Sequence, residues 1–130
     1  MNLMAKAAEV LKHAYAPYSK FYVACAVETA NGKVFTGTNV ENACYNAGTC
    51  AERTAVSQAI SQGEKKITRV AIINKSDRPC PPCGLCLQFL NEFIGPDVEI
   101  LTANGDQSQV DKYKFSQLLP VTYDKSYLPK

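Results

Sequence analysis

Two short cysteine motifs constrain this chain more than any other feature. One is Cys50-Ala51-Glu52-Arg53, and the other, about thirty residues later, is Pro82-Cys83-Gly84-Leu85-Cys86. Three thiols, with a carboxylate two residues from the first, form an incomplete metal cage beside an acid–base group. A structural zinc site uses four protein ligands, whereas a catalytic zinc site leaves one position open for water. The pattern therefore predicts an open zinc site held by Cys50, Cys83 and Cys86, with Glu52 acting on the water.

Composition limits the remaining possibilities. The chain has 130 residues, 46% hydrophobic and 20% charged, which predicts one globular domain over residues 1–130. Its formal charge of +2, without a Lys/Arg cluster, gives no reason to expect a nucleic-acid partner. No apolar run reaches the roughly 18 to 20 residues of a membrane span, and no signal-peptide core is visible, so we expect no membrane partner and a cytoplasmic location.

The six cysteines and the single histidine narrow the chemistry further. Without an export signal, metal or redox chemistry is favoured over three disulfides. Cys25 lies in an apolar run and is interpreted as a small buried hydrophobe. A Cys–His nucleophilic dyad would have to use His13, which lies in a predicted N-terminal helix far from both motifs.

The hydrophobic pattern predicts an alternation of strands and helices. An amphipathic helix is expected over residues 2–14, a strand over 21–29, a hairpin turn at Asn31-Gly32 and a returning strand over 33–38. A loop follows over residues 39–49. Thr49 is expected to cap the next helix, with Glu52 completing a capping box and Gly63 ending the helix.

The second half of the chain is predicted to contain another strand followed by another helix. Apolar residues 67–74 predict a strand buried on both faces, and residues 83–93 have helical spacing. Further short elements are a strand over 98–102, an edge strand over 107–115 and a helical turn closed by Pro120. Two strand–helix units after a hairpin predict an α/β sandwich with a mixed sheet.

This arrangement places both cysteine motifs at the N-termini of helices. Free backbone N–H groups and the positive end of the helix dipole favour thiolate over thiol there. Cys83 and Cys86 are three residues apart, so they share one face of a helix. Three thiolates around Zn²⁺ carry a net charge of about −1, which Arg53 is placed to balance, and Glu52 is placed to take the proton of an activated water.

Three other kinds of site use similar spacing. Cys83-Gly84-Leu85-Cys86 is similar to a thioredoxin-like redox motif, although the order of elements differs and the Cys50–Glu52 pair is left unexplained. Cys80, Cys83 and Cys86 have the spacing of the first three ligands of a ferredoxin run, but the fourth cysteine is missing. A structural Cys₄ zinc could use Cys80 as the fourth ligand. Only the open site accounts for Glu52.

The chain resembles cytidine deaminases of the small, homotetrameric, all-cysteine type. The resemblance covers roughly residues 12–123, and its motifs lie at residues 15–21, 37–45, 50–55, 82–86 and 118–120. The Cys-x-Glu and Pro-Cys-x-x-Cys pairing is the zinc deaminase signature. The resemblance implies a three-layer α-β-α sandwich with a mixed five-stranded sheet, one Zn²⁺ per chain, a nucleoside substrate and a homotetramer with shared active sites.

The resemblance also implies a reaction and a set of contacts. Cytidine and 2′-deoxycytidine would be hydrolysed to uridine and 2′-deoxyuridine plus ammonia, in pyrimidine salvage, with Glu52 carrying protons from water to N3 and then to the leaving amine. Backbone near Ala51 would orient the pyrimidine, Asn39 and Glu41 would bind the ribose 3′-hydroxyl, and Phe21 would pack against the nucleoside. The implied substrate-binding loop also includes Asn42, Ala43 and Tyr45, of which the last two would reach the 5′ side from a neighbouring subunit.

Three departures from the family pattern bear on substrate choice. Leu87 replaces the usual Arg after the last ligand, Tyr22-Val23-Ala24-Cys25 replaces Pro-Val-Gly-Ala, and Tyr123 stands near the usual terminal Phe. A deaminase of a modified cytosine nucleoside such as blasticidin S therefore stays open as an alternative. A non-catalytic zinc-binding or redox module is the alternative from a different class, and polynucleotide editing is disfavoured because no basic groove is indicated.

Overall fold

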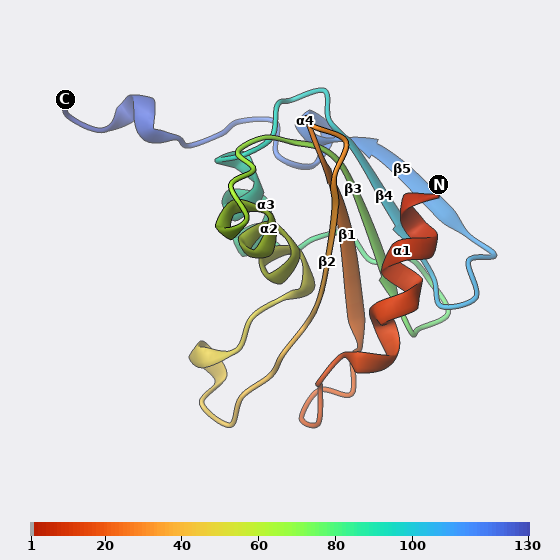
Figure 1. Cartoon of the computed structure of the whole chain (residues 1–130). Coiled ribbons are helices and arrows are strands. Elements are labelled where there is room, and N and C mark those ends of the chain that lie inside the picture. The colour runs from red at the N-terminus through yellow and green to blue at the C-terminus, as the bar shows by residue number, and fades with distance from the viewer. Residues whose placement is uncertain (1) are drawn as a thin grey trace.

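A mixed five-stranded sheet with the order β2-β1-β3-β4-β5 forms the centre of the molecule (Figure 1). The computed structural model describes residues 2–130. Only β3 and β4 pair in parallel, and the other neighbours are antiparallel. The strands are β1 Val23–Thr29, β2 Val34–Thr38, β3 Ile67–Asn74, β4 Glu99–Ala103 and β5 Val110–Lys114.

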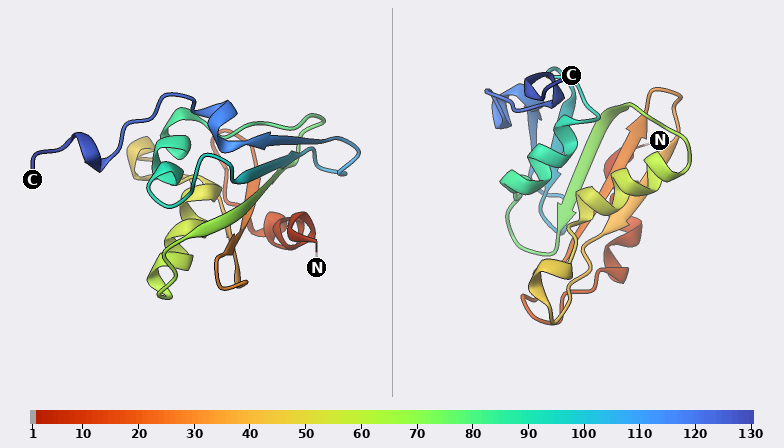
Figure 2. Two further views of the ribbon diagram at one scale, coloured as in Figure 1. Left: turned by 90° about the horizontal axis from the view of Figure 1, so that it is seen from above. Right: turned by 90° about the vertical axis from the view of Figure 1, so that its left-hand side faces the viewer.

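Helices cover both faces of this sheet, as the predicted three-layer sandwich requires (Figure 2). Helix α1 packs against one face, and α2 and α3 pack against the other. The helices are α1 Leu3–Val10, α2 Ala51–Ser61, α3 Gly84–Asn91 and α4 Phe115–Leu118. Short 3₁₀ turns occupy Leu11–His13, Tyr45–Ala47 and Lys125–Tyr127.

The strand sequences explain the two cores. In β1, Cys25 and Val27 join the cluster under α2 and α3, whereas Ala24 and Ala26 join the cluster under α1. Successive side chains of a strand point to opposite faces, so β1 needs apolar residues at both sets of positions. The central strand β3 is buried on both faces, as predicted, and the prediction that Cys25 is a buried hydrophobe is confirmed.

The direction of the strands brings the two cysteine motifs together. Both β2 and β3 run antiparallel to β1, so the carboxyl ends of β2 and β3 lie at the same edge of the sheet. The chain leaves β2 and β3 at that edge and returns as α2 and α3 on the same face. The N-termini of these helices therefore meet outside the carboxyl ends of the strands, where open α/β sheets bind ligands.

The start of α2 differs from the prediction. The N-cap residue is Cys50, not Thr49, and no side chain caps the helix by a hydrogen bond. The capping box was wrong because Glu52 is then the second residue of the helix, where its carboxylate turns into the protein interior and is only 4% exposed. The hairpin turn at Gly32 and the helix end at Gly63 are confirmed, and both glycines have positive φ.

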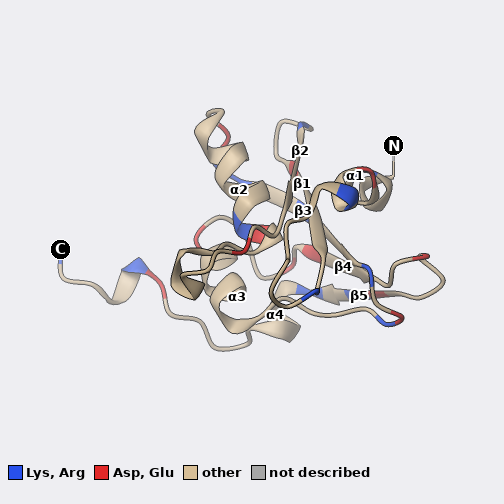
Figure 3. Ribbon diagram, turned by 90° about the horizontal axis from the view of Figure 1, so that it is seen from below, with Lys and Arg blue, Asp and Glu red and all other residues tan. Residues whose placement is uncertain are grey.

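No helix within residues 2–130 has the length and apolar character to span a membrane. Basic and acidic residues are interspersed along the ribbon and do not gather on one element (Figure 3). His13 is exposed in the turn after α1 and does not line the cavity described below.

Candidate active site

A cavity of about 590 Å³ opens at the edge of the sheet where α2 and α3 begin. This volume is in the range of small-molecule sites. Its walls come from the segment before β1, the 39–49 loop, the start of α2, the end of β3 and the 80–86 loop. Both cysteine motifs and the predicted substrate-binding loop therefore contribute to one cavity.

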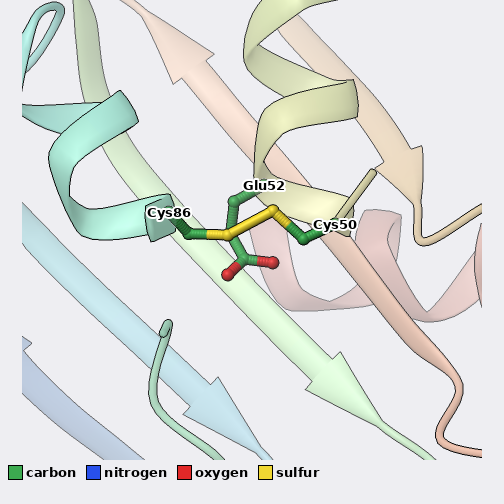
Figure 4. Close-up of side chains that lie close together, drawn as sticks. All are labelled: Cys50, Glu52 and Cys86. Carbon is green, nitrogen blue, oxygen red and sulfur yellow. A yellow bond between two sulfur atoms is a disulfide. The ribbon is translucent and has the colours of Figure 1, made fainter. Parts of the chain in front are cut away.

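Three of the predicted site residues form a tight cluster at the base of this cavity. The ligand atoms of Cys50, Glu52 and Cys86 all lie within 4.8 Å of one another. Figure 4 shows the Glu52 carboxylate beside the two sulfurs, one from the start of α2 and one from α3. Cys83, the third predicted ligand, is exposed and lines the same cavity, but it is not part of the tight cluster.

The sulfurs of Cys50 and Cys86 are joined as a disulfide in the structure. Their Cα atoms lie 7.3 Å apart, beyond the range of about 4.4–6.8 Å in which disulfides usually occur. Two thiolates on one tetrahedral zinc need sulfurs about 3.8 Å apart, given Zn–S bonds of about 2.3 Å. The wide backbone separation, together with a third thiol in the cavity wall, fits a thiolate-held zinc.

The helix starts favour ionised sulfur at this position. Cys50 is the N-cap of α2 and Cys83 is the N-cap of α3, and neither side chain makes a capping hydrogen bond. A Ser, Thr, Asp or Asn in these positions would accept one from the first turn. Both helices thus begin without the usual side-chain cap, and their free N–H groups and dipoles favour a nearby anion.

Burial shapes the acid–base properties of Glu52 and its neighbour Cys25. Burial raises the pKa of Glu52 above its ordinary value, because the charged form loses hydration. A carboxylate with a raised pKa binds a proton more readily than an ordinary carboxylate, which suits a group that takes a proton from water. Burial, with a smaller contribution from the charge of Glu52, raises the pKa of Cys25 well above its ordinary value, so this thiol stays protonated.

Asn39 and Glu41 are fixed at the cavity wall by hydrogen bonds. The Asn39 side chain donates to the Phe21 carbonyl at 2.7 Å and accepts from the Val23 N–H at 3.0 Å. The Glu41 carboxylate accepts from the N–H groups of Tyr18 and Ser19, both at 3.1 Å, and from the Ser19 hydroxyl. These bonds, led by the Ser19 hydroxyl, lower the pKa of Glu41, so it is an ionised acceptor at neutral pH.

The other predicted contacts are divided between the cavity wall and the outer loop. Phe21, Ala51 and Arg53 line the cavity, with Ala51 fully buried. Asn42 and Tyr45 also line it and are exposed to solvent at its rim. Ala43 is exposed and lies outside the described lining.

Some lining residues were not predicted from the sequence. Tyr18 and Ser19 form part of the wall because Glu41 holds their backbone, a contact across more than twenty residues. Asn74, at the end of β3, is buried, and its side chain accepts from Ser76 and donates to the Arg78 carbonyl. A polar residue ending an apolar strand was the one signal for it in the sequence.

Among the departures from the family pattern, Cys25 lies near Glu52, whereas Leu87, Tyr22 and Tyr123 do not line the cavity. Leu87 is buried in the core under α3 and does not line the cavity. Tyr22 packs against the α1 cluster, on the opposite side of the sheet. Tyr123 is exposed, and its backbone carbonyl accepts hydrogen bonds from Gln88 and Asn91 of α3.

Comparison with known proteins gives one consistent match. The family model described as "Cytidine and deoxycytidylate deaminase zinc-binding region" matches residues 1–102. The chain is 37% identical over 118 residues to the cytidine deaminase of Halalkalibacterium halodurans, covering 91% of this chain and 89% of that one. A crystal structure of cytidine deaminase from Burkholderia pseudomallei superposes with a TM-score of 0.87 at 38% identity, covering 93% of this chain and 96% of that chain.

A more distant relative has a different substrate in its name. The blasticidin-S deaminase of Bacillus cereus is 25% identical to this chain over 116 residues, with 83% of this chain and 81% of the relative covered.

Proposed function

The chain belongs to the cytidine and deoxycytidylate deaminase family and deaminates cytidine hydrolytically, and we propose that the Cys50–Glu52–Cys86 cluster is its catalytic centre. The observation that carries this assignment is the meeting of two cysteine sulfurs and a buried carboxylate within 4.8 Å, at two helix N-termini facing one cavity. Residues 1–130 would act as a single deaminase domain.

Cys50, Cys83 and Cys86 would hold one Zn²⁺ per chain. When bound, the zinc supplies Lewis-acid chemistry that brings the pKa of a water molecule toward about 7. Cys83 would complete the ligand set, because it is the N-cap residue of α3 and lines the same cavity as Cys50 and Cys86. Arg53, which also lines the cavity, would offset part of the negative charge of three thiolates.

Glu52 would transfer the protons of the reaction. It first takes a proton from water and delivers it to N3 of the pyrimidine, while the water oxygen bonds to C4. It then moves the second proton of that water to the exocyclic amine, the C4–N4 bond breaks, and ammonia leaves with the carbonyl of uridine formed. Its burial supports this role, because a carboxylate with a raised pKa is a stronger base toward the proton of the water.

Asn39 and Glu41 would bind the ribose. Glu41 is held rigid by Ser19 at the cavity wall, so a ribose hydroxyl would meet an acceptor that is already oriented. A site with a buried or fixed polar group discriminates strongly against analogues that lack its partner. Contacts with the 3′-hydroxyl would make both cytidine and 2′-deoxycytidine substrates. Phe21 and the Ala51 backbone would position the base.

Three finer expectations belong to the same proposal. The pair Ala43 and Tyr45 lies on an exposed loop, which supports contact with a neighbouring subunit in a homotetramer with shared sites. Thiolate ligands must stay reduced, which supports a cytoplasmic location, where thiols are kept reduced. Return of cytosine nucleosides to the uridine pool would place the enzyme in pyrimidine salvage.

The decisive experiment compares wild type with Glu52→Gln. Zinc per chain would be measured by mass spectrometry of the metal, and loss of cytidine and 2′-deoxycytidine by absorbance. We expect one zinc in both proteins and a loss of at least about 10³-fold in kcat in the variant. A fully active Glu52→Gln would refute the role of Glu52. A zinc-loaded wild type inactive on cytosine nucleosides would favour the non-catalytic alternative.

The blasticidin S alternative is tested in the same assay. The similarity to a blasticidin-S deaminase at 25% identity makes it a specific competitor. The free-ribose contacts proposed for Asn39 and Glu41 predict that kcat/KM for cytidine exceeds that for blasticidin S. The opposite order would identify the modified nucleoside as the better substrate.

A further inference from the structure

Arg53 lines the cavity without a carboxylate partner in the described part of the chain. It is half-buried, and the described lining contains no other Lys or Arg. No carboxylate within residues 2–130 lies within 4.0 Å of its guanidinium, and its side chain makes no hydrogen bond to that part of the chain. Its guanidinium lies over the ring of Phe89, whose centroid is 5.8 Å from Cζ of Arg53.

This contact forms a second bridge between the helices that carry the thiols. Arg53 follows Cys50 by three residues, and Phe89 follows Cys86 by three residues. Residues three apart lie on one side of a helix, so the Arg53–Phe89 contact lies one turn along from the Cys50–Cys86 contact. Phe89 packs against the core under α3, and its ring centroid lies 5.7 Å from that of Phe93.

An aromatic partner has a particular consequence for the guanidinium. The ring face attracts the positive charge through its quadrupole but accepts no strong hydrogen bond. The N–H groups of Arg53 thus stay available, and its charge is not neutralised, as it would be by a carboxylate. The ring of Phe89 can therefore hold the Arg53 guanidinium in place while its full positive charge stays available to offset the negative charge of the thiolates.

We propose that Phe89 is a positioning residue that holds the Arg53 guanidinium beside the thiolates by its ring face. This inference rests on the proposed function, because it takes the negative charge that Arg53 balances to be that of the proposed thiolate ligands, which line the same cavity. Phe89 touches neither substrate nor metal in this arrangement. Loss of its ring releases the guanidinium into solvent and lowers the affinity of the thiolates for zinc.

The test uses Phe89→Leu, which removes the ring but keeps an apolar side chain, and Phe89→Tyr, which keeps the ring. Phe93→Leu is the matched control, because it removes a neighbouring ring that has no guanidinium over it. Zinc affinity would be measured by competition with a chelator. The sulfur-to-metal charge-transfer bands of the Co²⁺-substituted protein would report the surroundings of the thiolates, and kcat and KM would be measured separately.

For Phe89→Leu we expect zinc affinity to fall by about twofold to thirtyfold, the range of cation–π contacts from exposed to desolvated. The charge-transfer bands should shift and kcat should fall with KM nearly unchanged. Phe89→Tyr should restore all three quantities, and Phe93→Leu should leave them at wild-type values even where it lowers Tm. If Phe89→Leu fails to fold, Phe89→Met replaces it with the same expectations.

Three results would overturn this inference in different ways. Equal zinc affinity and equal bands in wild type and Phe89→Leu, with wild-type turnover of cytidine normal, would refute the role of Phe89 alone. A wild type that binds no zinc and deaminates no cytosine nucleoside would refute the proposed function, and the role of Phe89 with it. If Phe89→Tyr, which keeps the ring face, loses zinc affinity as Phe89→Leu does, the ring face is not what holds Arg53 and the inference is refuted.

Discussion

Substitution of Gly37 tests whether the spacing between β2 and α2 sets the catalytic geometry. A Cβ at position 37 would lie 2.5 Å from the backbone nitrogen of Ala55 and 2.8 Å from Cβ of Thr54. Favourable contacts between heavy atoms are about 3.5 Å or longer, so Gly37→Ala forces β2 and α2 apart by roughly 0.5–1 Å. That shift moves the helix that begins at Cys50 and carries Glu52.

The shift has one effect on stability and a larger one on activity. Overpacking of this kind costs about 1–3 kcal/mol, which lowers the Tm of a chain of this size by about 3–15 °C. Displacement of a catalytic group by about 1 Å can cost about 10²-fold in rate. We therefore expect kcat/KM for cytidine to fall by about 10- to 100-fold at 25 °C, where the variant is still folded.

Calorimetry and the cytidine absorbance assay measure the two effects on the same sample. The matched control is Gly95→Ala, because a Cβ at position 95 meets no atom within 4 Å and its φ is not positive. This control should keep kcat/KM and shift Tm by no more than about 2 °C. A Gly37→Ala enzyme with the Tm and kcat/KM of wild type would refute the argument that β2 sets the position of α2.

Three further predictions concern the thiols and one distant carboxylate. Replacement of Cys50, Cys83 or Cys86, the three proposed ligands, by Ala should abolish zinc binding and activity. Zinc should be retained in Cys25→Ala, Cys44→Ala and Cys80→Ala, and zinc loss in Cys80→Ala would indicate a four-cysteine site. Oxidation with diamide after zinc removal should join Cys50 to Cys86, whose sulfurs already meet in the structure, whereas bound zinc should protect both cysteines from oxidation. Peptide mapping would detect the disulfide. Equal oxidation with and without zinc would contradict the proposal that both cysteines bind the metal. Hydrogen bonds from Thr29 and Asn31 lower the pKa of Glu64, so its stabilising effect is present above about pH 4.3 and lost as pH falls through the lower folded pKa. The drop in Tm between pH 7 and pH 3 should thus be smaller in Glu64→Gln, and an equal drop would exclude this role.

Local sequence signals predicted most of the elements in this fold. The apolar run of β3 and the Asn31-Gly32 turn specify their own conformations, and both appear where predicted. The start of α2 was missed because local rules favour Thr49 as a cap, whereas the cavity places Cys50 there with its sulfur beside that of Cys86. A site that uses a cap position for its own chemistry departs from the usual capping preference, and such departures are expected at functional sites.

Contacts across the fold could not be predicted from spacing. Glu41 meets Ser19, and Arg53 meets Phe89, only because the loop before β1 lies beside the 39–49 loop and α2 lies beside α3. The motif identified the chemical groups, since a Cys-x-Glu and a Cys-x-x-Cys carry their own geometry on helices. Which side chains hold those groups in place depends on tertiary packing.

Leu87 illustrates how the structure changes the meaning of a sequence difference. From sequence, the loss of the family arginine at this position removes a positive charge near the metal. In the fold, Leu87 is buried among apolar residues under α3, and the cavity wall in the described chain contains a single cation, Arg53. In the proposed site, the charge balance would then depend on how firmly Arg53 is held, and its guanidinium lies over the ring of Phe89. An arginine introduced at position 87 should therefore disturb the core under α3 and lower Tm. In a variant that lacks Arg53, it should not replace the missing positive charge at the cavity wall.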